Sequence, residues 1–434
     1  MPPINQLTAI LKKTESYLTQ TLLPFWIQRA PDPQAGGFLT YFDANGKPTG
    51  QTTKTFLMQI RMLYTMASAH RAGYGNGQCA RLAHAGAQFI LDHYWDDLHD
   101  GWFWVADRAG QPTCLDKIGY GQCFALYAFS EYFLATADPR GRDAALRTYD
   151  AIARHMIDVR HGGIIELCHQ DWTPMSPGSA GGDRKSLDVH MHFVEALTNL
   201  YQMTGCASHR RRLTQTIDLI LAKMLHPDLG LGFAQFTFDF TPLPAIIFDT
   251  TWGRDADPQH DQAAKPLDQT SPGHNVELAW LLLHAADVLH LPRQTYAHVL
   301  RNVCDHCITF GIDPEFGGVY ADVPMDHPTQ LTEKQFWQHA EVLIAMLDAV
   351  ALLGDDKYWH AFTHVHDYIF DHFIAMHADG EWYERLGRRG NVLDGDLAHA
   401  WKISYHTVRS MIQTVRRLKA LAQPPSAANP PTPT

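Results

Sequence analysis

The sequence predicts an all-α protein, an (α/α)6 barrel with short β-hairpins and loops at one end. Glycine-containing turns followed by short aromatic runs recur six times along the chain. The intervals between them hold pairs of helical segments, one apolar nearly all round and its partner apolar on one face. Helical hairpins of this kind bury their apolar faces most economically when they close into a ring.

Each repeat opens with the same kind of turn. A glycine is followed by a run rich in aromatic and β-branched residues and then by a polar turn that often ends in proline, which is typical of a small β-hairpin. The turns begin near residues 37, 101, 163, 231, 317 and 380. Their spacing is about 65 residues, except for a longer fourth interval that contains an insertion at 248–270.

The segments between the turns have helical periodicity, with apolar residues at three- and four-residue steps. The segments predicted to form the inner layer are "FLMQIRMLYTMASAHRAG", "GQCFALYAFSEYFLATA", "HFVEALTNLYQMTG", "VELAWLLLHAADVLH" and "AEVLIAMLDAVALLG". "RRRLTQTIDLILAKML" has a single apolar face and predicts an outer helix. An open solenoid is the alternative arrangement. Closure predicts that the first and last repeats pack together, and the lack of polar capping repeats favours it.

Length and composition restrict the class of protein. We expect one catalytic domain over residues 1–422 and a disordered, proline-rich tail over 423–434. The net charge of -11, without long runs of one sign, argues against nucleic acid or an anionic membrane as the main partner. There is no secretory signal, no uninterrupted apolar stretch long enough to span a bilayer and no disulfide framework, which together indicate a cytoplasmic protein with a small polar ligand. We assign the CxxC pair, Cys304 and Cys307, to packing.

Polar residues recur at the starts of the apolar helices. In "SPGHNVELAWLLLHAADVL", residues 271–289, His274 and Glu277 are three apart and share one helix face. The other inner segments contribute Lys54, Arg61, Asp188, His192, Glu195, Trp337, Glu341, Trp401, Tyr405, His406 and Arg409. Any one of them fits a helix cap or a satisfied buried group. Their recurrence in successive repeats is hard to explain by packing, because each buried charge needs its own partner, and it predicts a pocket.

Several chemistries compete for this pocket. A metal site is not expected, because His190 and His192 are two apart and point to different sides of a helix, and no HExxH motif occurs. Glycoside hydrolysis needs two carboxylates, for which Glu277, Glu341 and Asp188 are candidates. Histidines and an arginine outnumber the carboxylates, which favours proton transfer next to a carbonyl, with a histidine on each side of the carbon. A non-catalytic sugar-binding barrel is a further alternative.

Several segments together resemble one known family. They are "FW...PDPQAGGF", "KTFLMQIRMLY", "YGQCFALYAFSEY", "DVHMHFVEALTNLY", "GHNVELAWLLLHAA", "FWQHAEVLIAML" and "WKISYHTVRSM". Over residues 15–420 the chain resembles the N-acylglucosamine 2-epimerase superfamily, which includes cellobiose 2-epimerase, mannose 2-epimerase and related aldose–ketose isomerases. The resemblance implies an (α/α)6 barrel that interconverts sugars without a cofactor, through an open-chain aldose and a cis-enediolate.

The resemblance also implies roles for the predicted residues. By motif position, His274 and His406 resemble the two acid/base histidines and Arg61 the residue that holds the reacting oxygens. Glu277 would orient or tune His274, and His192 would contact sugar oxygens and assist ring opening. Trp337 and Trp401 would offer apolar faces to the sugar. The remaining predicted substrate-binding residues are Asp188, Glu341 and Lys54.

The chain departs from the cellobiose-acting branch at two places and in the insertion. It has Asp188 where that branch has asparagine, and Phe336 before Trp337 where that branch has two tryptophans. With residues 248–270 covering the pocket, these departures favour a monosaccharide. We expect C2 epimerisation of an aldose of the glucose/mannose or N-acylglucosamine/N-acylmannosamine type. Isomerisation of mannose to fructose is the main alternative, an inverting glycoside hydrolase is a remoter one, and a homodimer is plausible by base rate.

Overall fold

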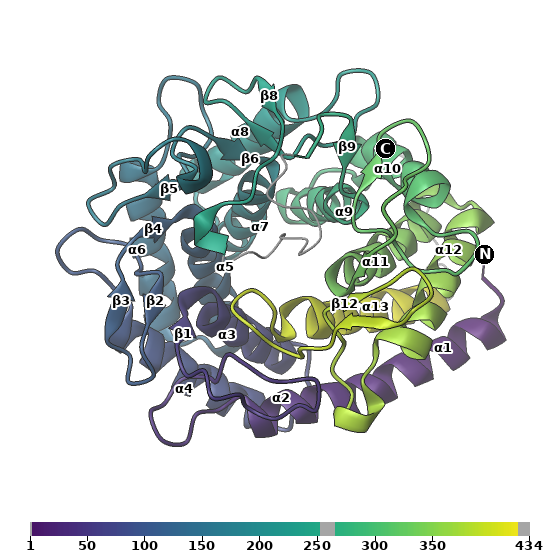
Figure 1. Cartoon of the computed structure of the whole chain (residues 1–434), viewed down its shortest axis with the longest axis horizontal. Coiled ribbons are helices and arrows are strands. Elements are labelled where there is room, and N and C mark those ends of the chain that lie inside the picture. Colours follow the sequence, from purple (N-terminus) through teal and green to yellow (C-terminus); the bar gives the residue numbers. More distant parts are fainter. Residues whose placement is uncertain (1, 252–264, 424–434) are drawn as a thin grey trace, which may run out of the picture.

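The chain folds into a ring of helices in a computed structural model that describes residues 2–251 and 265–423 (Figure 1). Within the described residues, the inner helices are α3 Phe56–Arg71, α5 Gly119–Thr136, α7 Leu187–Thr204, α9 Pro272–Leu289, α11 Phe336–Leu353 and α13 Ser404–Ala422. The protein is mostly helical, as predicted. Residues 252–264 of the predicted insertion and 424–434 of the predicted tail lie outside the described residues.

The inner helices pack on one another in chain order. Each contacts the next, and α13 contacts α3, so the last inner helix lies beside the first (Figure 1). An open solenoid would leave this pair apart. Helix α11 is apolar and long enough to cross a membrane by length and composition, but 78% of it is buried inside the protein, which accounts for its hydropathy.

A second set of helices covers the outside of the ring. They are α1 Ile4–Tyr17, α4 Gln78–His93, α6 Pro139–His155, α8 Ala207–Lys223, α10 Ala297–His306 and α12 Asp356–Tyr368. The short α2, Leu23–Arg29, follows α1 and contacts α4. Helices α4, α6, α8, α10 and α12 each pack on the inner helix that precedes them, whereas α1 packs on α13. The two ends of the chain therefore form one inner and outer pair, which confirms that the first and last repeats meet.

Two of the inner helices, α7 and α9, begin at a serine that caps the helix. The Ser186 side chain accepts the Val189 amide at the start of α7, and the Ser271 side chain accepts the His274 amide at the start of α9. Helix α7 is followed by Gly205 with a φ of 62°, a left-handed conformation that ends a helix without strain only in glycine. The serine caps thus fix where the polar first turns of α7 and α9 start.

Short antiparallel strands connect neighbouring repeats at the end of the ring where the inner helices begin. The strands are β1 Lys54–Thr55, β2 Val105–Ala106, β3 Pro112–Cys114, β4 Lys117–Ile118, β5 Leu167–Cys168, β6 Lys185–Ser186, β7 Gln235–Phe236, β8 Pro242–Leu243, β9 Gln269–Thr270, β10 Val323–Pro324, β11 Lys334–Gln335, β12 Arg385–Leu386 and β13 Val392–Asp394. The sheet orders are β1-β2-β3, β4-β5, β6-β7-β8, β10-β9 and β11-β12-β13. In each, the strand before an inner helix pairs with the hairpin of the next repeat, and a bridge from Phe42 to Ala398 joins the first hairpin to the last loop.

A buried lysine stands two residues before five of the inner helices. These lysines are Lys54, Lys117, Lys185, Lys334 and Lys402, and Thr270 takes the position before α9. The Lys54 ammonium donates to the carbonyls of Gly36 and Arg108 and lies 3.1 Å from the Asp32 carboxylate. Lys54 therefore holds the hairpins together, and the structure does not place it with the other residues predicted to bind substrate.

A second polar position serves the same hairpins from inside each helix. Gln59, Gln122, His190, Asn275 and His339 are each the fourth residue of an inner helix and accept a backbone amide of the neighbouring hairpin, at 2.8 to 3.0 Å. Asn275 also donates to the Thr270 hydroxyl at 2.9 Å. These buried polar groups are satisfied by the repeat itself, so they need no ligand.

Replacing Lys185 with methionine should lower the free energy of unfolding by about 3 kcal/mol or more, because it leaves the Asp158 carboxylate and the carbonyls of Gly162 and Phe238 without their shared donor. The measurement is the urea unfolding midpoint. Lys12→Met on the exposed side of α1 is the control and should change stability by less than about 0.5 kcal/mol. Equal midpoints for the two variants would show that the lysine position is not structural.

Candidate active site

The candidate site is built from equivalent positions of the inner helices. The sixth residues of these helices are Arg61, Phe124, His192, Glu277, Glu341 and Arg409. The third residues of α9 and α13 are His274 and His406. Positions three apart lie one above the other on a helix face. Because the inner helices all start at the same end of the ring, their side chains meet at two levels below the hairpins.

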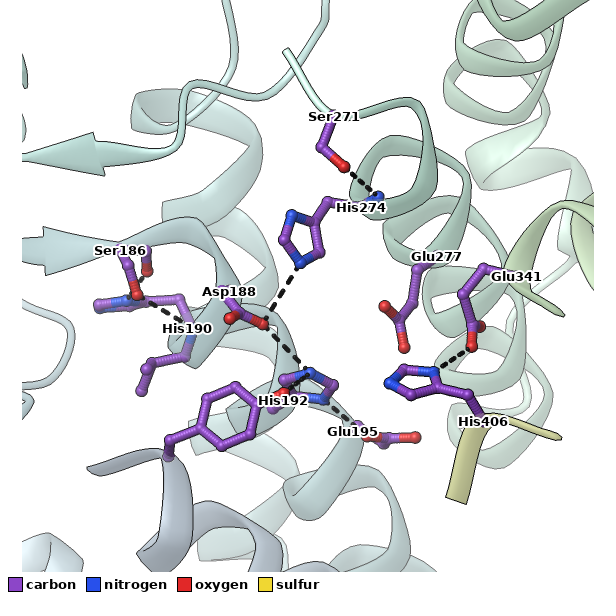
Figure 2. Close-up of polar contacts among 12 residues, drawn as sticks. Ser186, Asp188, His190, His192, Glu195, Ser271, His274, Glu277, Glu341 and His406 are labelled. Carbon is purple, nitrogen blue, oxygen red and sulfur yellow. Dashed lines mark hydrogen bonds and ion pairs between the residues drawn. The ribbon is translucent and has the colours of Figure 1, made fainter. Parts of the chain in front are cut away.

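A cavity of about 350 Å³ lies above these side chains, between the first helical turns and the hairpins. Of the predicted site residues, Asp188, His274, Trp337 and Trp401 line it. Figure 2 shows the imidazoles of His274 and His192 facing Asp188, and His406 beside Glu341, all directed toward the same space. The structure thus brings together all the predicted site residues except Lys54.

Asp188 bridges two histidines. Its Oδ1 atom lies 3.2 Å from His192 Nε2 and 3.6 Å from His274 Nε2 (Figure 2). The His274 side chain is 27% exposed, whereas the His192 side chain is 2% exposed. Asp188 therefore couples one histidine that faces the cavity to one that lies beneath it.

His192 is held as an imidazolium. Its Nδ1 atom lies 3.0 Å from Glu195 Oε2, so a carboxylate faces each of its ring nitrogens. Burial lowers the pKa of His192, but the hydrogen bonds to Asp188 and Glu195 outweigh burial and raise the pKa to about 9. The Tyr120 hydroxyl, which lines the cavity, lies 3.1 Å from Nε2. Tyr120 thus lies between His192 and the cavity.

This charge makes a testable contribution to stability. Because the pKa of His192 is raised above its ordinary value of 6.5, its stabilisation is fully present below about pH 6.5 and is lost as the pH rises through about 9. The difference in thermal midpoint between the wild type and His192→Gln should therefore shrink from pH 6.5 to pH 9.5. The exposed His298→Gln serves as control, and a His192→Gln difference that stays constant over this range would contradict the charged state.

His406 is held in the opposite charge state. Its Nδ1–H donates to Glu341 Oε1 at 2.7 Å. Burial lowers the pKa of His406 to about 3, despite the neighbouring carboxylate. The ring is therefore neutral, with its proton on Nδ1 and a lone pair on Nε2. Its centroid lies 5.8 Å from that of the Trp337 ring, which is also 4.6 Å from His274. Both predicted acid/base histidines thus flank the same indole.

Arg409 lies at the centre of three buried carboxylates, which we call the carboxylate cluster: Glu195, Glu277 and Glu341. One guanidinium nitrogen, Nη2, donates to Glu277 Oε1 and Glu341 Oε1, each at 2.7 Å, and the other, Nη1, donates to Glu195 Oε1 at 2.6 Å. Glu277 was predicted to contact His274, but it accepts from Arg409 instead. The carboxylate that lies beside His274 is that of Asp188. Glu277 and Glu341 are also absent from the lining of the cavity as described.

The three carboxyls do not share one protonation state. Burial raises the pKa of Glu277, and the charge of Glu341 adds to the effect. Burial also acts against ionised Glu341, but Arg409 and the hydrogen bond from His406 outweigh it and lower the pKa of that carboxyl. With Glu277 protonated and His406 neutral, the ionised carboxylates of Glu195 and Glu341 both accept from Arg409, and Glu195 also faces His192. Opposite charges at hydrogen-bond distance are the arrangement in which burial tolerates them.

Two further features concern the ligands that the site can hold. One donor atom from each of Glu277, Glu341 and His406 lies within 4.8 Å of the others, a spacing that suits a metal ion. Arg409 already donates to both of these carboxylates, so the chain itself supplies their cation. Arg61 donates to the carbonyl of Trp401 at 2.7 Å and to the Tyr120 hydroxyl at 2.8 Å, which places its guanidinium beside the cavity wall.

Sequence reasoning missed the roles of three residues. Tyr120 contacts both Arg61 and His192, Glu195 holds the far side of His192, and Arg409 joins the carboxylate cluster. A signal for Arg409 was present in the sequence, since counting six residues from each helix start selects it. No comparable signal exists for Tyr120, because a tyrosine in an apolar helix is ordinary core composition.

Comparison with known proteins gives one consistent family. The family model described as N-acylglucosamine 2-epimerase (GlcNAc 2-epimerase) matches residues 36–410. Cellobiose 2-epimerase of Bacteroides fragilis is 26% identical over 424 residues, covering 93% of this chain and 98% of that protein. D-mannose isomerase of Marinomonas mediterranea is 23% identical over 414 residues, covering 93% and 96%.

A solved structure resembles the whole ring. The structure of cellobiose 2-epimerase from Spirochaeta thermophila has a TM-score of 0.82 at 24% identity, and the match covers 96% of this chain and 99% of that one. At this sequence identity, the structural similarity is evidence for the fold alone.

Proposed function

Because the chain belongs to the N-acylglucosamine 2-epimerase family, we propose that it is a sugar isomerase that epimerises C2 of an aldose monosaccharide. The observation on which this rests is the placement of His274 and His406 on one indole, Trp337, beside the cavity. Two imidazoles beside one indole provide the two bases that a two-base proton exchange needs, since one base serves each face of the reacting carbon.

The proposed reaction proceeds by proton transfer alone. Neutral His406 takes the C2 proton of the open-chain aldose at Nε2, and the electrons of the broken C–H bond form the C1–C2 double bond of an enediolate. The charge moves to the O1 atom, where Arg61 and the hydroxyl of Tyr120 would stabilise it. His274 returns a proton to C2 from the other face, which completes the inversion. Ionised Glu341 stabilises the imidazolium formed at His406, as a buried carboxylate does behind a catalytic histidine.

The second candidate is aldose–ketose isomerisation, such as mannose to fructose. The same enediolate gives the ketose when its proton returns to C1 instead of C2, so the two outcomes differ by about one ångström in the placement of the intermediate. The likeness to a D-mannose isomerase, 23% identical over 93% of the chain, supports keeping this candidate.

The geometry of Glu277 and Glu341 disfavours an inverting hydrolase that would use this pair. An inverting pair of carboxyls is separated by about 6.5–9.5 Å to admit a water molecule. One carboxylate oxygen of Glu277 lies within 4.8 Å of one of Glu341, and both carboxyls accept hydrogen bonds from Arg409. This pair is therefore better suited to hold other groups than to flank a glycosidic bond.

We also propose that residues 1–422 form one catalytic unit, an (α/α)6 barrel closed by α13. The small cavity, about 350 Å³, favours a monosaccharide. Phe248 and Thr250 line it, and the Thr250 carbonyl accepts from Trp104 Nε1 at 3.3 Å, which supports a role of the insertion in covering the site.

The test is incubation of the protein with mannose, glucose or N-acetylmannosamine in heavy water, followed by NMR of the products. Epimerisation predicts the C2 epimer with deuterium at C2, and isomerisation predicts fructose with deuterium at C1. Untouched aldoses and released reducing sugar from an oligosaccharide would instead indicate a hydrolase. A protein that binds a sugar without exchanging any hydrogen would be a sugar-binding barrel.

A further inference from the structure

We propose that Arg409 is a shared positioning residue, whose single guanidinium fixes both carboxylate–histidine pairs of the site. This inference deepens the proposed function and rests on it for the reaction that the histidines perform. The arrangement itself is independent of the sugar, so it is open to a test without substrate. Arg409 is 2% exposed, and its two terminal nitrogens donate to Glu195, Glu277 and Glu341, so the contacts of this side chain lie within the protein.

The two pairs lie on opposite sides of the guanidinium. On one side, Arg409 Nη1 donates to Glu195, whose other oxygen lies 3.0 Å from Nδ1 of His192. On the other side, Nη2 donates to Glu341 Oε1, which also accepts Nδ1–H of His406 at 2.7 Å. Each histidine is thus one carboxylate away from the same cation.

Other contacts fix the guanidinium itself. Its carbon atom lies 4.1 Å from the centroid of the Tyr405 ring and 5.0 Å from that of Trp280. Trp280 also donates to Glu341 Oε2 at 2.9 Å, and the Tyr405 hydroxyl lies 3.0 Å from both oxygens of Glu195. Arginine presents its donors in a rigid planar fork, so one side chain can hold several carboxylates at fixed angles, which a lysine cannot do.

The position of Arg409 in its repeat also supports a positioning role. Arg409 is the sixth residue of its inner helix, the position that supplies His192, Glu277 and Glu341 in other repeats. Burial favours the neutral form of each of the three glutamates, and Arg409 lowers the pKa of Glu195 and Glu341 against it. The guanidinium thus keeps these two carboxyls ionised in the orientation that the imidazoles require. Loss of the guanidinium should therefore change both histidines together.

The experiment is NMR of protein labelled with 15N in histidine, without sugar. Signals of His192 and His406 are assigned by their loss in His192→Gln and His406→Asn. In Arg409→Lys we expect the imidazole signals of both histidines to move and both titration curves to shift. A change in neither histidine, or in only one, would overturn the proposal.

Arg417 offers a matched control on the same two helices. From α13 it donates to Asp348 of α11 at 2.7 Å, much as Arg409 donates to Glu341. Arg417→Lys should leave both histidine signals unchanged, and equal changes in both variants would mean that any buried ion pair between α11 and α13 has this effect. Where a sugar substrate is turned over, Arg409→Lys should lower kcat by about 10- to 100-fold with little change in KM.

A second variant covers the case in which Arg409→Lys does not fold. R409M/E277Q removes the guanidinium together with the Glu277 carboxyl to which it donates, so no carboxyl is left at position 277 without its partner. It should move both histidine signals in the same way as the lysine variant. Unmoved signals in the folded double variant would also overturn the proposal. Failure of the proposed function would appear separately, as wild-type protein that leaves every aldose untouched.

Discussion

Replacing His406 with asparagine is expected to lower kcat by about 10²- to 10⁴-fold, the loss usual for a general base. His406 Nδ1–H donates to Glu341, which fixes the tautomer and leaves Nε2 as the only basic atom of the ring. Burial lowers the pKa of His406 to about 3, so the ring is already deprotonated at neutral pH. Asparagine can still donate to Glu341 but cannot take a proton from carbon.

The measurement is single-substrate kinetics on the aldose that the wild type converts, together with thermal unfolding. An unchanged midpoint shows that the loss belongs to chemistry and not to folding. Turnover within about threefold of the wild type would rule out His406 as the base.

The fold was predictable because each repeat is specified by residues that are close together in the sequence. Glycine-containing turns and helical periodicity depend on residues close together in the chain, so they gave the helical repeat and its two layers correctly. Closure also followed, since α1 and α3 both pack on α13 as the ring requires. The family resemblance is confirmed by the match over residues 36–410.

The site was predictable only in part, because its partners come from different helices. His274, His406, Arg61, His192 and Asp188 stand in the first two turns of their helices, near the starts where the sequence placed them. Their pairings depend on how neighbouring helices are rotated in the ring, and no local pattern reports that rotation.

Two predictions were wrong, the contact of Glu277 with His274 and the place of Lys54 in the pocket, and both concern partners from other parts of the chain. Glu277 shares a helix face with His274, and sequence spacing alone favoured contact between them. In the fold, Arg409 from α13 attracts Glu277, and Asp188 from α7 takes the place beside His274. Lys54 was assigned to the pocket because it is a charged residue before an apolar helix. Its equivalents in other repeats bind hairpin carbonyls and aspartates, which identifies a structural repeat that one segment alone cannot reveal.

Replacing His274 with asparagine should abolish net epimerisation, again by about 10²- to 10⁴-fold, but it should leave one partial reaction intact. In a two-base mechanism each imidazole serves one face of C2. His406 can still remove the C2 hydrogen of the epimer that presents it, and can return deuterium from heavy water to the same face. The variant should therefore exchange the C2 hydrogen of one epimer and leave the other epimer untouched, measured by NMR of each sugar separately.

His284→Asn, further along the same helix α9, is the control and should retain both epimerisation and exchange. Exchange in both epimers by His274→Asn would mean that one base reaches both faces, so that His274 only positions the substrate. Exchange in neither would mean that His274 is needed before any C–H bond breaks, for example in opening the sugar ring. Only exchange confined to one epimer fits two imidazoles on opposite faces of a single carbon, because a lone base that serves one face has no route to the inverted product.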